Sequence, residues 1–311
     1  MAKPAPAKTF FLFLFLFIFS LPSTAQDSAR HFFNKGYYNI SVNREAAIDY
    51  LTKCIEIDSL YTEAFFHRGI CYFKGSRYEQ ALNDFDRAFE LNPGLSIIWM
   101  YRGFTYRNMG KTDEALNSFS RYITQNPTDT TAYSYILRGK MKYELGDFTG
   151  AVEDYDMALK LKPLEEKYQY YRFVALYDNE MYRKALSAAD RLTKINPDFY
   201  GYYFYKGNIY SKMGKPDSAI YMYNISIIKN YQNADGYFYR AQAYQQKGDL
   251  NKALEDYNTA IELNPDDGSY YSKRGNCRLE KSDKTGACKD WEEAGTLGYY
   301  EDFDKVKKVC E

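Results

Sequence analysis

Histidine is scarce in this chain of 311 residues, and cysteine is sparse. His31 and His67 are the two histidines, and neither stands at metal-ligand spacing from the five cysteines, which argues against a zinc site. Basic and acidic residues balance at 41 each, with no long tract of one sign and no basic stripe that would neutralise phosphates. The sequence therefore predicts no metal, no cofactor and no nucleic-acid partner.

The motifs of common catalytic chemistries are also missing. The chain has no glycine-rich phosphate loop, no Gly-x-Ser-x-Gly elbow, no His-Glu-x-x-His pair and no Cys-His pair at suggestive spacing. Acidic pairs such as Asp84 with Asp86, or Asp154 with Asp156, stand between apolar positions, and we interpret them as solvated helix faces. We predict a protein that is not an enzyme, and an enzyme with a hidden active site is the weakest alternative.

The amino terminus has the organisation of a secretory signal peptide. Lys3 and Lys8 precede the almost uninterrupted apolar run Phe10–Leu21, and a Ser-Thr-Ala triplet ends at Ala25. As a helix this run would be about 18 Å long, short of the roughly 30 Å hydrocarbon core of a bilayer. We predict cleavage of residues 1–25 and a mature chain in the periplasm, the cell envelope or outside the cell. The alternative is an uncleaved anchor.

Aromatic residues are abundant, with 34 tyrosines and 21 phenylalanines, and they follow a period of 34 residues with one 36-residue step. A glycine marks the period, an alanine follows twelve residues later, and a large aromatic stands four residues after the alanine. The glycines are Gly69, Gly103, Gly139, Gly207 and Gly275, the alanines are Ala81, Ala115, Ala151, Ala219 and Ala287, and the aromatics are Phe85, Phe119, Tyr155, Tyr223 and Trp291.

Some units depart from this pattern. One unit has Ala241 in place of the glycine, and the unit around Phe173 keeps Ala185 but lacks both the glycine and the later aromatic, so we expect it to form the weakest interface. With a degenerate first unit around Gly36, eight units occupy residues 28–300.

Each unit contains two apolar stretches with helical spacing, separated by a breaker of glycine or serine. The recurring small residues would let two antiparallel helices approach, and the aromatic would fill the space between them. One helical pair cannot bury its apolar face alone, so the units must stack. Residues 301–311 predict an amphipathic helix that caps the last unit, and no linker rich in proline or serine divides the chain.

The pattern resembles the tetratricopeptide repeat across nearly the whole mature chain. The residues that carry the resemblance most completely are Trp99, Gly103, Tyr106, Ala115, Phe119 and Pro127. It implies an all-α fold, a right-handed superhelical solenoid of about eight helix-turn-helix units with a C-terminal capping helix. It also implies a scaffold that binds another protein or a peptide. The sequence leaves open the identity of that partner and the oligomeric state of the chain.

The resemblance further implies that the first helix of each unit lines a concave face, which ligands contact at its fifth, ninth and twelfth positions, among others. These positions include Phe66, Phe73, Met100, Phe104, Tyr143, Tyr170, Tyr177, Phe204, Asn208, Phe238 and Gln242. No unit combines the fifth-position lysine and ninth-position asparagine that grip a terminal carboxylate in this family. The alternative is that tight curvature buries these side chains against neighbouring helices.

An aromatic and uncharged groove suits an extended or helical peptide. The leading prediction is therefore a protein–protein interaction scaffold of the cell envelope. A carbohydrate- or peptidoglycan-binding module is the alternative, because tyrosine rings also stack on sugars.

Three of the five cysteines, Cys277, Cys288 and Cys310, stand near the carboxyl terminus. Disulfides persist in exported chains, so we expect one disulfide within this group, with the connectivity open. Cys54 stands where other units have alanine and is interpreted as a small buried residue.

Overall fold

The computed structural model describes residues 23–126, 132–301 and 303–310, and every regular element in these ranges is a helix. The predicted signal segment up to residue 22 and the two extra residues near Thr128–Thr131 lie outside the described residues. The first helix begins at Ser23, so it contains the predicted cleavage site after Ala25.

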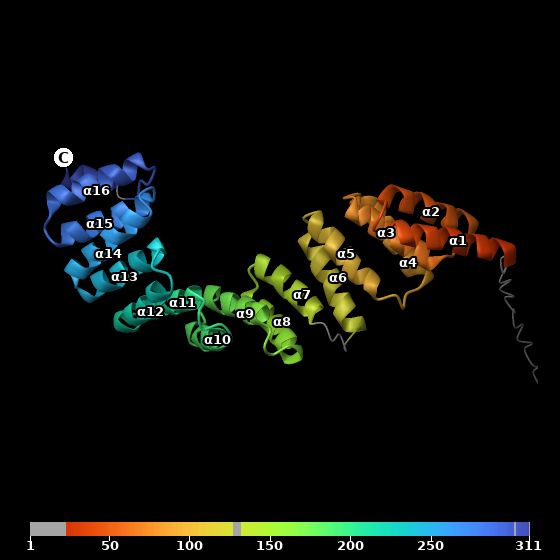
Figure 1. Ribbon diagram of the computed structural model, residues 1–311, viewed down its shortest axis with the longest axis horizontal. Coiled ribbons are helices and arrows are strands. Elements are labelled where there is room, and N and C mark those ends of the chain that lie inside the picture. The colour runs from red at the N-terminus through yellow and green to blue at the C-terminus, as the bar shows by residue number, and fades with distance from the viewer. Residues whose placement is uncertain (1–22, 127–131, 302, 311) are drawn as a thin grey trace, which may run out of the picture. The chain divides into compact units, whose positions relative to one another are not determined.

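The chain divides into two compact units, residues 1–126 and 127–311 (Figure 1). The helices of unit 1 are α1 (Ser23–Asn39), α2 (Arg44–Ile57), α3 (Thr62–Lys74), α4 (Tyr78–Leu91), α5 (Ile97–Asn108) and α6 (Thr112–Gln125). The helices of unit 2 are α7 (Tyr133–Glu144), α8 (Phe148–Leu161), α9 (Glu166–Asp178), α10 (Tyr182–Ile195), α11 (Tyr200–Lys212), α12 (Pro216–Lys229), α13 (Ala234–Lys247), α14 (Leu250–Leu263), α15 (Gly268–Glu280), α16 (Lys284–Thr296) and α17 (Phe303–Val309).

Each odd-numbered helix from α1 to α15 packs against the even-numbered helix that follows it, which gives eight helix hairpins. Within each unit, every even-numbered helix also contacts the first helix of the next hairpin, so the core continues from one hairpin to the next. The prediction of an all-α fold built from eight helix-turn-helix units is confirmed.

A small residue on the odd helix meets a large ring on the even helix in most hairpins. A Cβ atom added at Gly103 would lie 2.5 Å from the Phe119 ring, and one added at Gly207 would lie 2.4 Å from the Tyr223 ring. Both rings are fully buried. Because real Cβ atoms do not approach so closely, only glycine permits this spacing between the two helices.

The fifth hairpin, α9 with α10, reverses this arrangement. Phe173 stands where Gly139 stands in the preceding hairpin, and Ala189 stands where Tyr155 does. Phe173 is 1% exposed, Ala189 is fully buried, and both belong to one core cluster. The ring that the sequence indicated as missing is therefore supplied by the opposite helix.

The turn inside each of seven hairpins contains one residue with positive φ, at the same place in the repeat. These residues are Ser76, Gly110, Gly146, Glu180, Gly214, Gly248 and Ser282. The left-handed conformation favours glycine, which explains why glycine recurs at the breaker positions of the sequence.

The carboxyl terminus is joined to the last hairpin by a disulfide between Cys288 on α16 and Cys310, with 5.8 Å between the two Cα atoms. Cys277 is free and buried, as are Cys54 and Cys71. Burial raises the pKa of Cys277 to about 11 and that of Cys54 to about 12. These thiols therefore remain protonated and unreactive at neutral pH.

The reversed hairpin predicts strong coupling between its two exchanged positions. Phe173→Ala should cost about 3–5 kcal/mol because it leaves a cavity, and Ala189→Tyr should cost about 1–3 kcal/mol because it overfills the core. The double variant recreates the Ala241 and Tyr257 pairing of the seventh hairpin, so it should be clearly more stable than the sum of the single costs. Urea unfolding of all three variants measures this coupling, and simple additivity would contradict the exchange.

The cysteine arrangement predicts a stepwise alkylation pattern. Native protein should take up no iodoacetamide, and unfolding without reductant should expose the three free thiols. Reduction of the unfolded chain should then expose Cys288 and Cys310 as well. Peptide mapping by mass spectrometry distinguishes these steps, and labelling of Cys288 before reduction would contradict the disulfide.

Candidate functional site

All eleven side chains predicted to line the groove lie on odd-numbered helices, and none of them is exposed. Phe66 and Phe238 are buried, and Phe238 packs its ring 4.6 Å from that of Tyr270 in the next hairpin. These two positions follow the packing alternative. The other nine are half-buried: Phe73, Met100, Phe104, Tyr143, Tyr170, Tyr177, Phe204, Asn208 and Gln242.

Within unit 2, half-buried and exposed rings continue along four odd-numbered helices. We name this set the tyrosine face, and it consists of Tyr143 on α7, Tyr170 and Tyr177 on α9, Phe204 and Tyr205 on α11, and Tyr239 on α13. Ring centroids are 6.2 Å apart for Tyr177 and Tyr205, 5.9 Å for Phe204 and Tyr205, and 5.3 Å for Phe204 and Tyr239.

Two members of the tyrosine face, Tyr205 and Tyr239, were missed by the sequence analysis. Tyr239 is 37% exposed, which makes it the most accessible ring of the set. A periodic signal was present, because a tyrosine precedes the basic residue of the first helix in four units. These tyrosines are Tyr101, Tyr171, Tyr205 and Tyr239.

Burial raises the pKa of four hydroxyl groups of the tyrosine face, those of Tyr143, Tyr177, Tyr205 and Tyr239. Burial, followed by a hydrogen bond to the Asp178 carboxylate, raises the pKa of Tyr143 to about 12. Burial and a hydrogen bond with Tyr170 raise the pKa of Tyr205 to about 12. Nearby, Asn208 accepts a hydrogen bond of 2.8 Å from the Tyr223 hydroxyl. The face contains only tyrosine and phenylalanine side chains, so it carries no acidic or basic group and presents rings together with hydroxyl groups.

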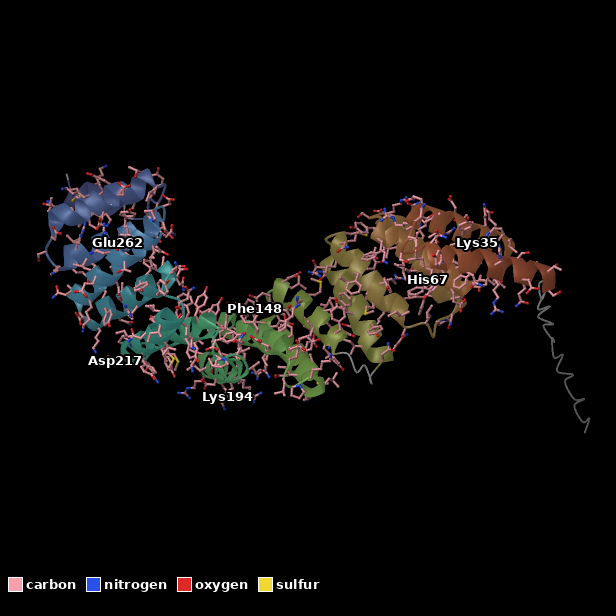
Figure 2. The ribbon with its side chains drawn as sticks, viewed as in Figure 1. Lys35, His67, Phe148, Lys194, Asp217 and Glu262 are labelled. Carbon is pink, nitrogen blue, oxygen red and sulfur yellow. A yellow bond between two sulfur atoms is a disulfide. The ribbon has the colours of Figure 1, made fainter. Side chains whose placement is uncertain are left out.

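His67, labelled in Figure 2, lies among aromatic rings of unit 1. Its ring centroid is 5.0 Å from that of Tyr37 and 5.3 Å from that of Phe66. Burial lowers the pKa of His67, so the imidazole is neutral at pH 7. Across the described ranges, no group of three or more His, Cys, Asp or Glu side chains is arranged to hold a metal ion.

None of the helices in the described part of the chain combines the length and the apolar character that crossing a membrane requires.

A second periodic feature is a basic residue in the first helix of seven hairpins, which we name the basic ladder. Its members are Arg68, Arg102, Arg138, Arg172, Lys206, Arg240 and Arg274. In four hairpins the arginine binds an aspartate sixteen residues later, on the second helix of its own hairpin, through two hydrogen bonds of 2.6–3.0 Å. These aspartates are Asp84, Asp154, Asp256 and Asp290.

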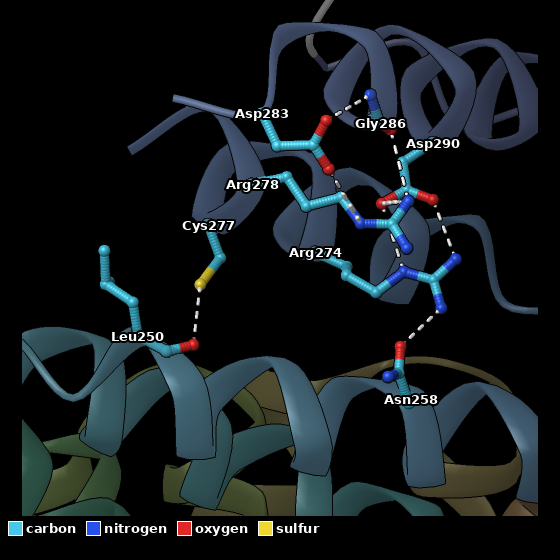
Figure 3. Close-up of polar contacts among 8 residues, drawn as sticks. All are labelled: Leu250, Asn258, Arg274, Cys277, Arg278, Asp283, Gly286 and Asp290. Atoms are coloured by element: carbon cyan, nitrogen blue, oxygen red, sulfur yellow. Dashed lines mark hydrogen bonds and ion pairs between the residues drawn. The ribbon is translucent and has the colours of Figure 1, made fainter. Parts of the chain in front are cut away.

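Members of the ladder also reach the preceding hairpin. Arg102 pairs with Asp86, Arg172 pairs with Asp156, and Lys206 pairs with Asp190, each sixteen residues earlier. Figure 3 shows Arg274 bound to Asp290 of its own hairpin and to Asn258 of the hairpin before it. The ladder thus closes hairpins and also joins neighbouring hairpins.

The interpretation of the paired acids as solvated faces was wrong for Asp84 and Asp154. Asp84 is 5% exposed and Asp154 is 2% exposed. Burial raises the pKa of Asp84, and the Arg68 guanidinium opposes that shift. The sequence signal was the basic residue sixteen positions before each of these acids.

Sequence comparison finds the tetratricopeptide repeat in three segments, residues 62–95 and 234–267 with one family model and residues 99–129 with another. No curated protein matches the chain.

Several solved structures have a similar fold. The C-terminal part of a TPR repeat-containing protein from Cytophaga hutchinsonii is 20% identical, and the match covers 75% of this chain and 95% of that one, with a TM-score of 0.63. YrrB, described as a TPR protein with an unusual peptide-binding site, is 18% identical over 60% of this chain and 95% of its own, with a TM-score of 0.52. At these identities the likeness shows the fold alone.

The ladder predicts unequal costs for two substitutions in α8. Asp154→Asn leaves Arg138 and Lys142 without a buried carboxylate, and it should cost about 3 kcal/mol. Asp156→Asn removes a carboxylate that is 45% exposed, and it should cost about 1 kcal/mol or less. Urea unfolding compares these matched variants, and equal costs would contradict the assigned burial.

Proposed function

We propose that this chain, which matches the tetratricopeptide repeat at residues 62–95, 99–129 and 234–267, is a non-catalytic scaffold that binds a protein or peptide partner on its tyrosine face. The main observation that supports this proposal is the run of partly accessible rings along four successive odd-numbered helices of unit 2. Tyrosine rings supply a large contact area with a polar tip and lose few rotatable bonds on binding, which is why they anchor many interfaces.

The chemistry of the face favours an uncharged or weakly charged segment. Tyrosine hydroxyl groups form hydrogen bonds with neutral partners, and Asn208 and Gln242 add half-buried amide groups on α11 and α13, two of the helices that carry the face. The peptide-binding site named for YrrB supports a peptide as the ligand class for a fold of this kind.

We place the scaffold in an oxidising compartment, in the periplasm, the cell envelope or outside the cell. The charged, apolar and small-residue order of residues 1–25 supports export. The disulfide between Cys288 and Cys310 supports it independently, because disulfides persist mainly in such compartments.

Affinity capture with the mature chain from an envelope fraction, followed by mass spectrometry, identifies the partner. Digestion of the fraction with a protease before capture distinguishes the two ligand classes. Loss of the captured material supports a protein partner. Its retention as saccharide supports the alternative, in which the same tyrosine rings stack on sugars.

Two positions on the tyrosine face, the half-buried Tyr177 and the exposed Tyr239, provide the mutational test. Tyr177→Ala combined with Tyr239→Ala should weaken binding of the captured partner at least about a hundredfold, since loss of each anchoring ring costs about 2 kcal/mol and each loss of about 1.4 kcal/mol is a factor of ten. The matched control is Tyr221→Ala with Tyr231→Ala, which removes two tyrosines that are 61% and 69% exposed and lie outside the face. Calorimetric titration measures both. Unchanged affinity of the first variant, or equal loss in the control, would show that the partner binds elsewhere.

A further inference from the structure

The third hairpin, α5 with α6, differs from its neighbours in the basic ladder. Ser118 stands sixteen residues after Arg102, where four other hairpins carry the aspartate that binds the arginine. The Ser118 hydroxyl instead donates a hydrogen bond of 2.7 Å to the backbone carbonyl of Glu114. Arg102 pairs with Asp86, and its Nε, which is buried, has no hydrogen-bond partner among the described residues.

A second buried donor lies beside the first. Trp99 is 6% exposed, and its indole Nε1 also lacks a hydrogen-bond partner within the described part of the chain. The guanidinium carbon of Arg102 lies 4.9 Å from the centroid of the Trp99 ring, and that of Arg121 lies 4.6 Å from the same centroid. Trp99, Arg102 and Arg121 border one recess of about 180 Å³, together with Tyr106 and Ser118.

We propose that this recess binds a carboxylate group supplied by another molecule, in the place where other hairpins carry their own aspartate. Buried donors without acceptors destabilise a fold, and a carboxylate is an acceptor that could satisfy both. In those hairpins the same arginine position already receives a carboxylate with good geometry.

The charges around the recess favour one negative charge over two. Arg102 and Arg121 bring two positive charges, Asp86 already pairs with Arg102, and Glu114 borders the recess with a second carboxylate. The surroundings are therefore close to neutral before a ligand arrives. A carboxylate fits this balance better than a phosphate dianion does, whether it comes from an acidic side chain of a partner protein or from a small free acid.

The first test supplies the missing carboxylate internally. Ser118→Asp should pair with Arg102 and raise the Tm by about 2–4 °C relative to Ser118→Asn, which has the same shape without the charge. An Asp variant that is no more stable than the Asn variant would overturn the assignment of the recess as a carboxylate site.

The second test observes the Trp99 donor directly. Trp291→Phe leaves Trp99 as the single tryptophan and keeps a ring like those at Phe85 and Phe119. The indole N–H signal in a nitrogen–proton correlation spectrum should shift with N-acetylglutamate amide and remain unmoved by the N-acetylglutamine amide control and by sodium chloride of equal ionic strength. The shift should disappear in Ser118→Asp and become larger at a given probe concentration in Glu114→Gln.

Sodium acetate separates the two sources of the carboxylate. A shift with acetate as strong as with the glutamate probe supports a small free acid, and a shift confined to the glutamate probe supports an acidic side chain of a partner. An indole signal that neither carboxylate moves overturns the proposal, even if Ser118→Asp is more stable.

Discussion

Contact between a ring on the even helix and a small residue on the odd helix sets the spacing on which the rest of each hairpin depends. Phe85 on Gly69 is one example, and the acids on either side of that ring, Asp84 and Asp86, follow from it. Successive residues of a helix point about 100° apart, so the residues flanking a buried ring diverge to its two sides. Asp84 binds Arg68 of its own hairpin, and Asp86 binds Arg102 of the next. Three consecutive residues therefore close one hairpin and attach its neighbour.

The sequence was sufficient for the helices, the repeat boundaries and most of this ring packing, because period and residue size are visible in one dimension. It was insufficient in the fifth hairpin, where the large side chain lies on the odd-numbered helix and the small side chain lies on the even-numbered helix. Phe173 and Ala189 fill the same space as a glycine and a tyrosine would, yet each departs from the pattern at its own position. Asp154 was misjudged for a related reason, since a periodic acid resembles a solvated face until its arginine partner is recognised.

The sequence predicted which helices carry the candidate-site side chains, but it predicted less well how exposed each of these side chains is. The family pattern assigns a side chain to the odd-numbered helices, but the following hairpin decides how much of it is covered. Tyr270 covers Phe238 and removes that ring from the surface, whereas Tyr239, its chain neighbour, stays accessible. Exposure at these positions is thus a property of two hairpins, and a pattern that describes one hairpin leaves it undetermined.

The basic ladder stabilises the hairpins, and in the third hairpin its arginine also borders the proposed binding recess. A buried guanidinium requires acceptors, and the chain supplies them from the same hairpin, from the preceding one, or from both. Where the forward acid is present, it gives the arginine two acceptors from its own hairpin. The third hairpin pairs Arg102 with an acid of the preceding hairpin, and two of its buried donors have no acceptor among the described residues. Such donors destabilise the free protein, so a ligand that supplies their acceptor, as proposed for the recess, would recover that free energy as binding affinity.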